Sequence, residues 1–324
     1  MRANAILAAV ATLLCMPALA DDTTPPQPQS IVPGVTLIPG GIRPNRQPDG
    51  NTVIFDAPAG LIVMDTGRHA WHRQAILDFA KARGKPIIAI INSHWHLDHV
   101  SGNPGLRTAY PGLRVYASNA IDAALTGFLA KSAADAKPYL GTGKLPPETE
   151  EDVRGDIATF ENGAALKPDV VIDKSADRVV AGKRLQANLA PNAATDGDVW
   201  VYDPATRVAA AGDLVTLPAP FLDTACPSGW SAALRRIAAT PFKTLIPGHG
   251  GPMTPAQFAT YRDAFDRFTA CAIGPRPAEE CAADWSKATA GLPGADAVRG
   301  EKMALYYVKD VLRMHGGKSA ECHA

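Results

Sequence analysis

The chain has 324 residues, a length that fits one large domain or one domain with an extension. Its 32 lysine and arginine residues balance its 32 aspartate and glutamate residues, so the formal net charge is zero. Because no block or stripe of basic residues is present, we do not expect a nucleic acid partner.

The first residues, 1–20, are typical of a secretory signal peptide. Arg2 supplies a positive charge, an apolar stretch follows, and Ala18-Leu19-Ala20 is a small-x-small cleavage site. The apolar stretch is too short to span a bilayer, so we expect no stable membrane insertion. We therefore expect a periplasmic or secreted protein whose polar, proline-rich residues 21–34 form a flexible N-terminal segment.

Export implies an oxidising compartment, in which cysteines form disulfides. Without the signal peptide, four cysteines allow three pairings, and sequence does not choose among them. Pairing Cys271 with Cys281, the closest two, would leave Cys226 with Cys322. We expect two disulfides, with free or metal-bound thiols as the alternative.

Strand-like and helix-like stretches alternate along most of the chain, and a helical tail follows them. Apolar runs predict the strands, whereas helical spacing of apolar residues predicts the helices. Strands are expected at residues 52–56, 61–65, 86–91, 113–117, 199–202, 208–211 and 244–246. Helices are expected at residues 71–83, 119–139, 230–239, 255–270, 279–290 and 296–314, with a loop at 142–149. This order is typical of a layered α/β domain.

The run from His94 to His99 holds three histidines and one aspartate in the pattern H-x-H-x-D-H. Imidazole and carboxylate are ligands that suit zinc and similar divalent metals. The run directly follows an apolar strand, so it predicts a metal site on a loop that a rigid strand holds in place. A His-rich surface loop is the alternative interpretation.

Two more candidate ligands follow strands further along the chain. Asp213 comes after the strand at 208–211, and His249 comes after the strand at 244–246. Each has a glycine beside it, which would let the backbone approach a metal closely.

Together these motifs resemble the metallo-β-lactamase superfamily, over roughly residues 35–251. The resemblance includes Asp65 in Met64-Asp65-Thr66-Gly67, the H-x-H-x-D-H run, Gly-Asp at Asp213 and Pro-Gly-His-Gly at His249. It implies an α/β fold, a four-layer αβ/βα sandwich over residues 35–253, with metals at one edge. Residues 254–324 would form a C-terminal helical extension.

The resemblance also implies zinc, as one or two ions, and a role for each ligand. It divides the ligands between two sites bridged by Asp213: His94 and His96 in the first, and Asp98, His99 and His249 in the second. Zinc lowers the pKa of bound water to about 7. Asp98 or Asp213 would be catalytic, holding the attacking water and moving its proton. Asp65 would orient the metal loop.

One family histidine is missing from this chain. The position expected to hold it is Ala194, and no histidine occurs between Val100 and Gly248. A methyl group cannot bind a metal, so we expect the Asp98/His99/His249 site to be the tighter one. A compensating ligand from Asn192, Thr195 or Asp196 is an alternative to water at the first site.

The other histidines and the aromatic residues near these motifs have less specific expectations. His69 and His72 are expected at the surface or capping a helix, although His69 could lie near the rim of the metal site. Trp95 is expected to pack between a sheet and a helix. Phe221 and Trp230 could line a substrate cleft, but core packing is the preferred role for each.

These features predict an exported zinc-dependent hydrolase that cleaves an amide, ester or thioester bond in a small molecule. A β-lactam is one candidate substrate, since an exported protein with this resemblance could be a β-lactamase. A fold and a metal motif do not by themselves set the substrate. The alternative is a degenerate family member that binds metal or ligand with little turnover. A structural or purely interacting protein is a third interpretation. The oligomeric state is not predicted.

Overall fold

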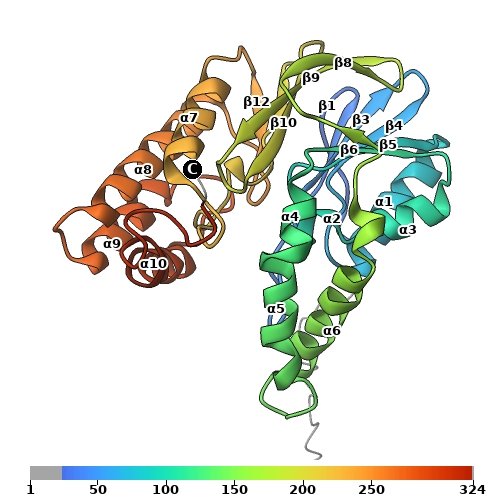
Figure 1. Cartoon of the computed structure of the whole chain (residues 1–324). Helices are drawn as coiled ribbons and strands as arrows, with labels where there is room; N and C mark the ends of the chain where they lie inside the picture. Colours follow the sequence, from blue (N-terminus) through green and yellow to red (C-terminus); the bar gives the residue numbers. More distant parts are fainter. Residues whose placement is uncertain (1–23, 323–324) are drawn as a thin grey trace, which may run out of the picture.

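The computed structural model describes residues 24–322 and places them in two sheets flanked by helices (Figure 1). The predicted signal peptide lies outside the described residues. The first sheet has the order β1-β2-β3-β4-β5-β6-β7 and the second has the order β12-β11-β10-β9-β8. The first contains β1 (Gln29–Val32), β2 (Val35–Ile38), β3 (Thr52–Ala57), β4 (Gly60–Met64), β5 (Ile87–Ile91), β6 (Arg114–Ala117) and β7 (Val170–Val171). The second contains β8 (Ala176–Val180), β9 (Lys183–Pro191), β10 (Gly197–Asp203), β11 (Val208–Ala210) and β12 (Thr244–Ile246).

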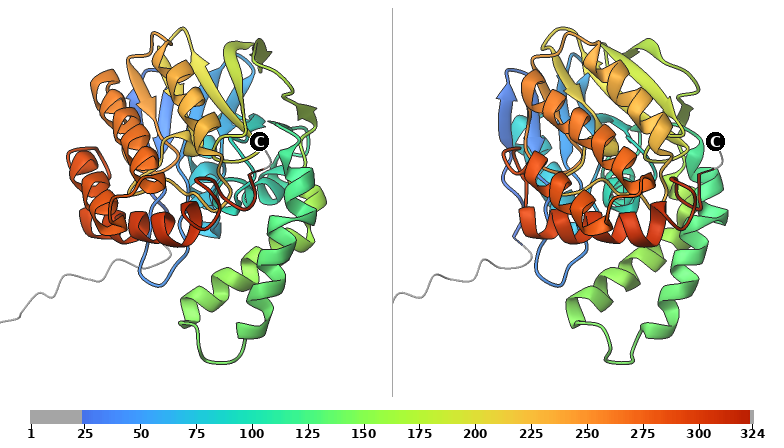
Figure 2. Two further views of the ribbon diagram at one scale, coloured as in Figure 1. Left: turned by 60° about the vertical axis from the view of Figure 1, so that its left-hand side comes forward. Right: turned by 90° about the vertical axis from the view of Figure 1, so that its left-hand side faces the viewer.

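The helices lie on the outer faces of the sheets and at one end of them (Figure 2). Those before the second sheet are α1 (Ala70–Arg83), α2 (Leu97–Val100), α3 (Asn103–Ala109), α4 (Ala120–Thr126), α5 (Phe128–Ala136) and α6 (Pro147–Glu161). Those after it begins are α7 (Pro227–Ala238), α8 (Pro255–Ile273), α9 (Ala278–Thr289) and α10 (Ala297–Tyr306), and a π-helical turn, Tyr307–Leu312, continues α10.

The buried strand β4 shows how the layers form. Its residues alternate between two cores: Ile62 packs into the core between the two sheets, whereas Leu61 and Val63 face the core that contains α1 and α3. The outer face of the second sheet is covered in turn by α7 and α8, whose Trp230 and Phe265 are fully buried. Because both faces of each sheet are covered, the predicted four-layer αβ/βα arrangement is confirmed.

The predicted flexible segment over residues 21–34 is partly wrong. Gln29–Val32 forms β1, which pairs antiparallel with β2. Ile31 and Val32 pack against the core between the sheets. Two apolar residues that reach a partner strand are enough to order the segment, although its composition is polar and rich in proline.

The helix expected over 119–139 is divided into α4 and α5, because the backbone of Gly127 is not helical. The expected loop at 142–149 ends at Pro146, and α6 begins at Pro147. Sequence reasoning did not predict α6. Together α4, α5 and α6 form a helical arm, residues 120–161, that extends away from the sheets (Figure 2).

The C-terminal helices are present as expected, and they share one core with α7. Tyr261 of α8, Trp285 of α9 and Tyr307 beyond α10 are all buried in it. Two disulfides are present, Cys226–Cys322 and Cys271–Cys281, so two disulfides form as expected. No helix in the described part of the chain is long and apolar enough to cross a membrane.

The two disulfides should differ in how much they stabilise the fold. Cys226 and Cys322 are 96 positions apart, whereas Cys271 and Cys281 are 10 apart. A cross-link that closes a longer loop restricts the unfolded chain more, so removing the first should cost about 4–5 kcal/mol and removing the second about 3 kcal/mol. Urea unfolding of the two double Cys→Ala variants measures these losses. A larger loss from the short loop would contradict this expectation.

Candidate metal centre

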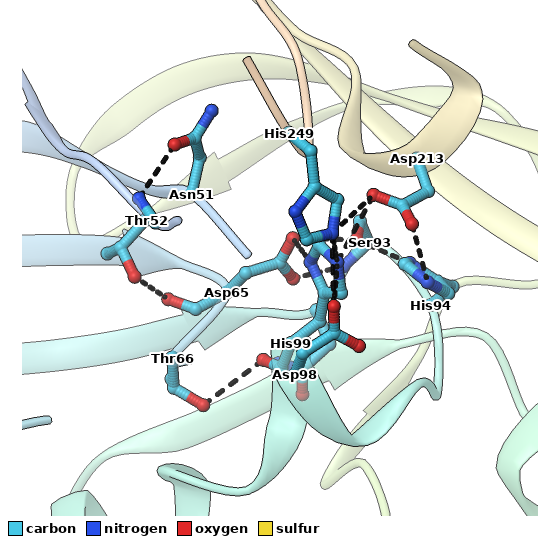
Figure 3. Close-up of polar contacts among 12 residues, drawn as sticks. Asn51, Thr52, Asp65, Thr66, Ser93, His94, Asp98, His99, Asp213 and His249 are labelled. Atoms are coloured by element: carbon cyan, nitrogen blue, oxygen red, sulfur yellow. Dashed lines mark hydrogen bonds and ion pairs between the residues drawn. The ribbon is translucent and has the colours of Figure 1, made fainter. Parts of the chain in front are cut away.

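The candidate ligands gather because four strands end at the same edge of the sandwich. The side chains of His94, Asp98, His99, Asp213 and His249 point toward one another there (Figure 3). Strand β4 pairs parallel with β5, and β11 pairs parallel with β12, so within each pair the carboxyl ends point the same way. His94 and His96 follow β5, and α2 then carries Asp98 and His99. Asp213 follows β11 and His249 follows β12.

Glycines allow the close approach that the sequence predicted. A Cβ at Gly248 would collide with Oδ1 of Asp213, and a Cβ at Gly212 would collide with the side chain of Ser93. Gly212 also has a positive φ of 53°, which a glycine adopts without strain. The Asp213 loop can therefore pack directly against the metal loop, and the His249 loop can pack against the Asp213 loop.

The two histidine nitrogens of the predicted second site lie close to each other and to carboxylate oxygens of Asp98 and Asp213, at distances that suit a zinc site. His99 Nε2 lies 3.6 Å from Asp98 Oδ2, 3.2 Å from Asp213 Oδ1 and 3.3 Å from His249 Nε2. His249 Nε2 lies 3.0 Å from Asp98 Oδ2 and 3.6 Å from Asp213 Oδ1. Tetrahedral zinc with bonds of about 2.1 Å holds its ligand atoms about 3.4 Å apart. The four side chains therefore fit one zinc ion.

The first site contains His94, His96 and Asp213, whose ligand atoms lie within 4.8 Å of one another. His94 Nε2 lies 3.7 Å from Asp213 Oδ2, so Asp213 directs one oxygen toward each site, as a bridging ligand would. His94 Nε2 and Asp213 Oδ1 are buried and have no hydrogen-bond partner among the described residues. Such atoms are costly to bury, and a metal ion is a partner that would use their lone pairs.

Thr224 lies beside the first site and connects His96 to the backbone of Ala194. Its hydroxyl donates to the backbone oxygen of Ala194, at 2.8 Å, and lies 3.1 Å from Nε2 of His96. Since the hydroxyl proton is already used, His96 donates from Nε2, and its Nδ1 keeps a free lone pair. Asp196, considered above as a compensating ligand, belongs to neither group of potential metal ligands in the described residues.

Asp65 orients histidines of both sites, as the resemblance implied. It accepts hydrogen bonds from the backbone nitrogen of Ser93 at 2.7 Å, from Ser93 Oγ at 2.6 Å and from His99 Nδ1 at 2.9 Å. Ser93 Oγ in turn lies 2.8 Å from Nδ1 of His94. With Nδ1 engaged on both rings, the Nε2 lone pairs of His94 and His99 are directed into the metal centre.

Burial and neighbouring charges shift the pKa values of the side chains around the centre in different directions. Burial lowers the pKa of His96 to about 4, which keeps this ring neutral, as a metal ligand must be. Burial alone would also lower the pKa of His99, but the charges of Asp213, Asp98 and Asp65 outweigh it and raise that pKa well above its usual value. Burial would raise the pKa of Asp213, but His99 and His249 lower it. A metal at the second site would therefore compete with a proton on His99.

His69 and His72 are buried, so the expected surface position was wrong for both, although His69 does occupy the N-cap position of α1. His69 is buried, with Nδ1 2.8 Å from Asp49 Oδ2 and Nε2 3.1 Å from Asp152 Oδ1, and it makes no capping bond. His72 is buried and bonded to Thr52 at 2.8 Å. Their partners are about 20 or more positions away in the sequence, one of them on the unpredicted helix α6. Local sequence patterns therefore do not predict these contacts.

The aromatic residues divide between core and cleft. Trp230 is fully buried in the core, and Trp95 packs against Phe128 of α5 with ring centroids 5.5 Å apart. Phe221 instead lines a cavity of ≈ 400 Å³ that also reaches Asp98, Asp213 and His249. Phe221 therefore has both of the roles considered, because it also packs, partly buried, against the core around α7.

Comparison with known proteins agrees with this geometry. The family described as the metallo-beta-lactamase superfamily matches residues 46–249. Because the match covers more than half of the chain, the protein belongs to this superfamily.

Characterised relatives cover only part of the chain. A linear primary-alkylsulfatase from Pseudomonas sp. (strain ATCC 19151) is 27% identical over 222 residues, which is 62% of this chain and 41% of the relative. A hydroxyacylglutathione hydrolase from Gloeobacter violaceus is 47% identical over 95 residues, which is 26% of this chain and 30% of the relative. The chain thus spans less than half the length of these relatives.

Solved structures show the same fold. A stereoselective inverting sec-alkylsulfatase from Pseudomonas sp. has a TM-score of 0.57 and 18% identity to this chain. The match covers 88% of this chain and 50% of the sec-alkylsulfatase chain. A metallo-beta-lactamase from Pontibacter korlensis has a TM-score of 0.53 and 16% identity to this chain. The match covers 74% of this chain and 98% of the metallo-beta-lactamase chain.

Replacing Asp65 tests its orienting role. Asp65→Asn removes one acceptor oxygen and the charge that holds His99, so zinc affinity should fall about 10–100-fold. Competition against a chromophoric chelator measures the affinity. Asp56→Asn is the matched control, because Asp56 pairs with Arg83 away from the centre. Equal zinc affinity in the two variants would contradict the role.

Proposed function

We propose that this protein is an exported, zinc-dependent hydrolase that cleaves an amide, ester or thioester bond in a small molecule. The observation that carries the proposal is the set of histidine nitrogens and carboxylate oxygens, on Asp98, His99, Asp213 and His249, at distances that suit one zinc ion. Two disulfides support export to the periplasm or beyond, because they persist in oxidising compartments.

The residues around the centre divide the work of hydrolysis. Zinc, when bound, would supply a charge that polarises the scissile bond and acidifies water. His99 and His249 would hold the ion, and Asp213 would bridge to the weaker first site. Asp98 directs Oδ2 toward His249, while its Oδ1 lies 3.8 Å from Arg68, which lines the same cavity. We assign proton transfer first to this Oδ1, with Asp213 as the second candidate.

The names of the relatives add alkyl sulfates and hydroxyacylglutathione to the candidate substrates, beside a β-lactam. The alternative function, metal or ligand binding with little turnover, is favoured by one observation: Ala194 leaves the first site without its third histidine. Metal content and turnover, measured on the same preparation, distinguish the two functions.

Metal removal and the loss of one ligand test the hydrolase. The mature protein should hold about one zinc per chain, and a chelator should abolish hydrolysis that zinc then restores. His249→Ala should reduce zinc content and lower turnover by about 100-fold or more. His315→Ala is the control, because His315 is exposed in the C-terminal tail. Zinc binding without turnover on amides, esters, thioesters or sulfate esters would favour the alternative, and no zinc would exclude both.

Restoring a histidine at position 194 tests the first site. Ala194→His supplies an imidazole while keeping the backbone oxygen that Thr224 binds. Zinc content should rise from about one toward about two per chain, as measured by elemental analysis. Asp196→His places a histidine in the same loop outside both sites, and it should leave the content unchanged. An unchanged content in Ala194→His would show that the loop lies away from the first site.

A further inference from the structure

The cavity beside the metal centre has walls built from segments outside the metal loops. Its volume is ≈ 400 Å³, within the range of small-molecule sites. Ile42 comes from the loop between β2 and β3, Phe128 and Leu129 come from α5, and Met303 comes from α10. Phe221 completes the lining from the loop before α7. Four segments far apart in the sequence therefore present apolar groups to one space.

Except for the buried Leu129, these apolar groups are only partly covered by the rest of the described chain. Ile42 is 42% exposed, and Phe128, Phe221 and Met303 are half-buried at the cavity. The apolar wall continues directly into the metal centre, since the ring of Phe221 lies 4.9 Å from that of His96. A ligand held by the metal centre would therefore have apolar surface beside it.

The charges of the cavity favour a neutral group next to the cleaved bond. Among the described lining residues, Arg68 is the one lysine or arginine. Its guanidinium pairs with Asp156 of α6 and lies 3.8 Å from Asp98, so its charge is already balanced. Away from the metals, an anionic group would meet carboxylates rather than a free cation.

The helical arm that carries Phe128 is held in place by buried ion pairs. Asp152 of α6 accepts from the backbone nitrogen of Gln47 at 2.8 Å and pairs with Arg46, also at 2.8 Å. His69 contacts the same carboxylate at 3.1 Å. The side chain of Asp152 is 1% exposed, so water screens these contacts little. The wall is therefore organised before a ligand arrives, which favours selection by shape.

We propose that the cavity binds an extended, uncharged apolar group of the substrate, such as an unbranched alkyl chain, and that Phe128 of the helical arm selects it. This deepens the proposed function and rests on it for the identity of the cleaved bond. The substrate class is an ester-like compound whose leaving or acyl part is a hydrocarbon chain, rather than a compact anionic compound such as a β-lactam.

Binding of alkyl carboxylates tests the proposal without relying on turnover. Sodium butyrate and sodium octanoate are titrated by calorimetry onto the zinc-loaded protein. Each buried methylene strengthens binding by up to about fourfold, so octanoate should bind at least about tenfold tighter than butyrate. Phe128→Ser should reduce this ratio to about threefold or less, whereas Phe128→Leu should keep most of it. Val179→Ser is the control, because Val179 is 73% exposed on β8 and does not line the cavity.

The outcomes separate this inference from the proposed function. Equal binding of butyrate and octanoate by the wild-type protein, or an unchanged ratio in a folded Phe128→Ser variant, would overturn the inference. Far-ultraviolet circular dichroism and zinc content show whether that variant is folded. Titration of the chelator-treated protein with the uncharged probes 1-butanol and 1-octanol, whose head group needs no metal, covers the case in which no hydrolysis is found. A chain-length preference that Phe128→Ser abolishes there would support the apolar site even if the proposed function failed.

Discussion

One buried carboxylate aligns the metal centre. Asp65 stands at the end of β4 with a positive φ of 61°, a conformation that a non-glycine residue seldom adopts. That backbone turn lets its two oxygens accept three hydrogen bonds from Ser93 and His99. Ser93 passes the constraint to His94 through its hydroxyl. Because both rings are fixed through Nδ1, Asp65 sets the direction of the Nε2 atoms of His94 and His99.

The two metal sites depend unequally on the loop that carries position 194. The second site takes its ligand atoms from residues held by α2 and by the loops after β11 and β12, and position 194 contributes nothing to it. The first site needs His96, which is oriented by Thr224 through the backbone oxygen of residue 194. That bond requires no side chain at position 194. The loss of a histidine there removes a ligand without removing the support for His96.

Local sequence patterns were sufficient for the features that lie on consecutive residues or on strand ends. The H-x-H-x-D-H run, the glycine beside His249 and the alternation within β4 each have a cause that lies within a few residues. Thr224 had no such signal, because it meets His96 across 128 positions. The burial of His69 likewise depends on Asp152, which lies on a helix with no clear apolar stripe. Charged residues at helical spacing resemble a solvated loop until a partner surface is known.

The helices outside the sandwich shape the cleft, and local patterns predicted most of these helices but neither α6 nor the cavity that they form with the sandwich. The sandwich positions the metal ligands, and this arrangement is common to proteins that act on different compounds. The helical arm and the C-terminal helices are additions to that sandwich, and Phe128, Met303 and Tyr307 from these additions line the cavity. The Cys226–Cys322 disulfide fastens the end of the chain close to the loop that carries Phe221. Substrate preference is therefore expected to follow the packing of these additions against the sandwich more than the metal motif itself.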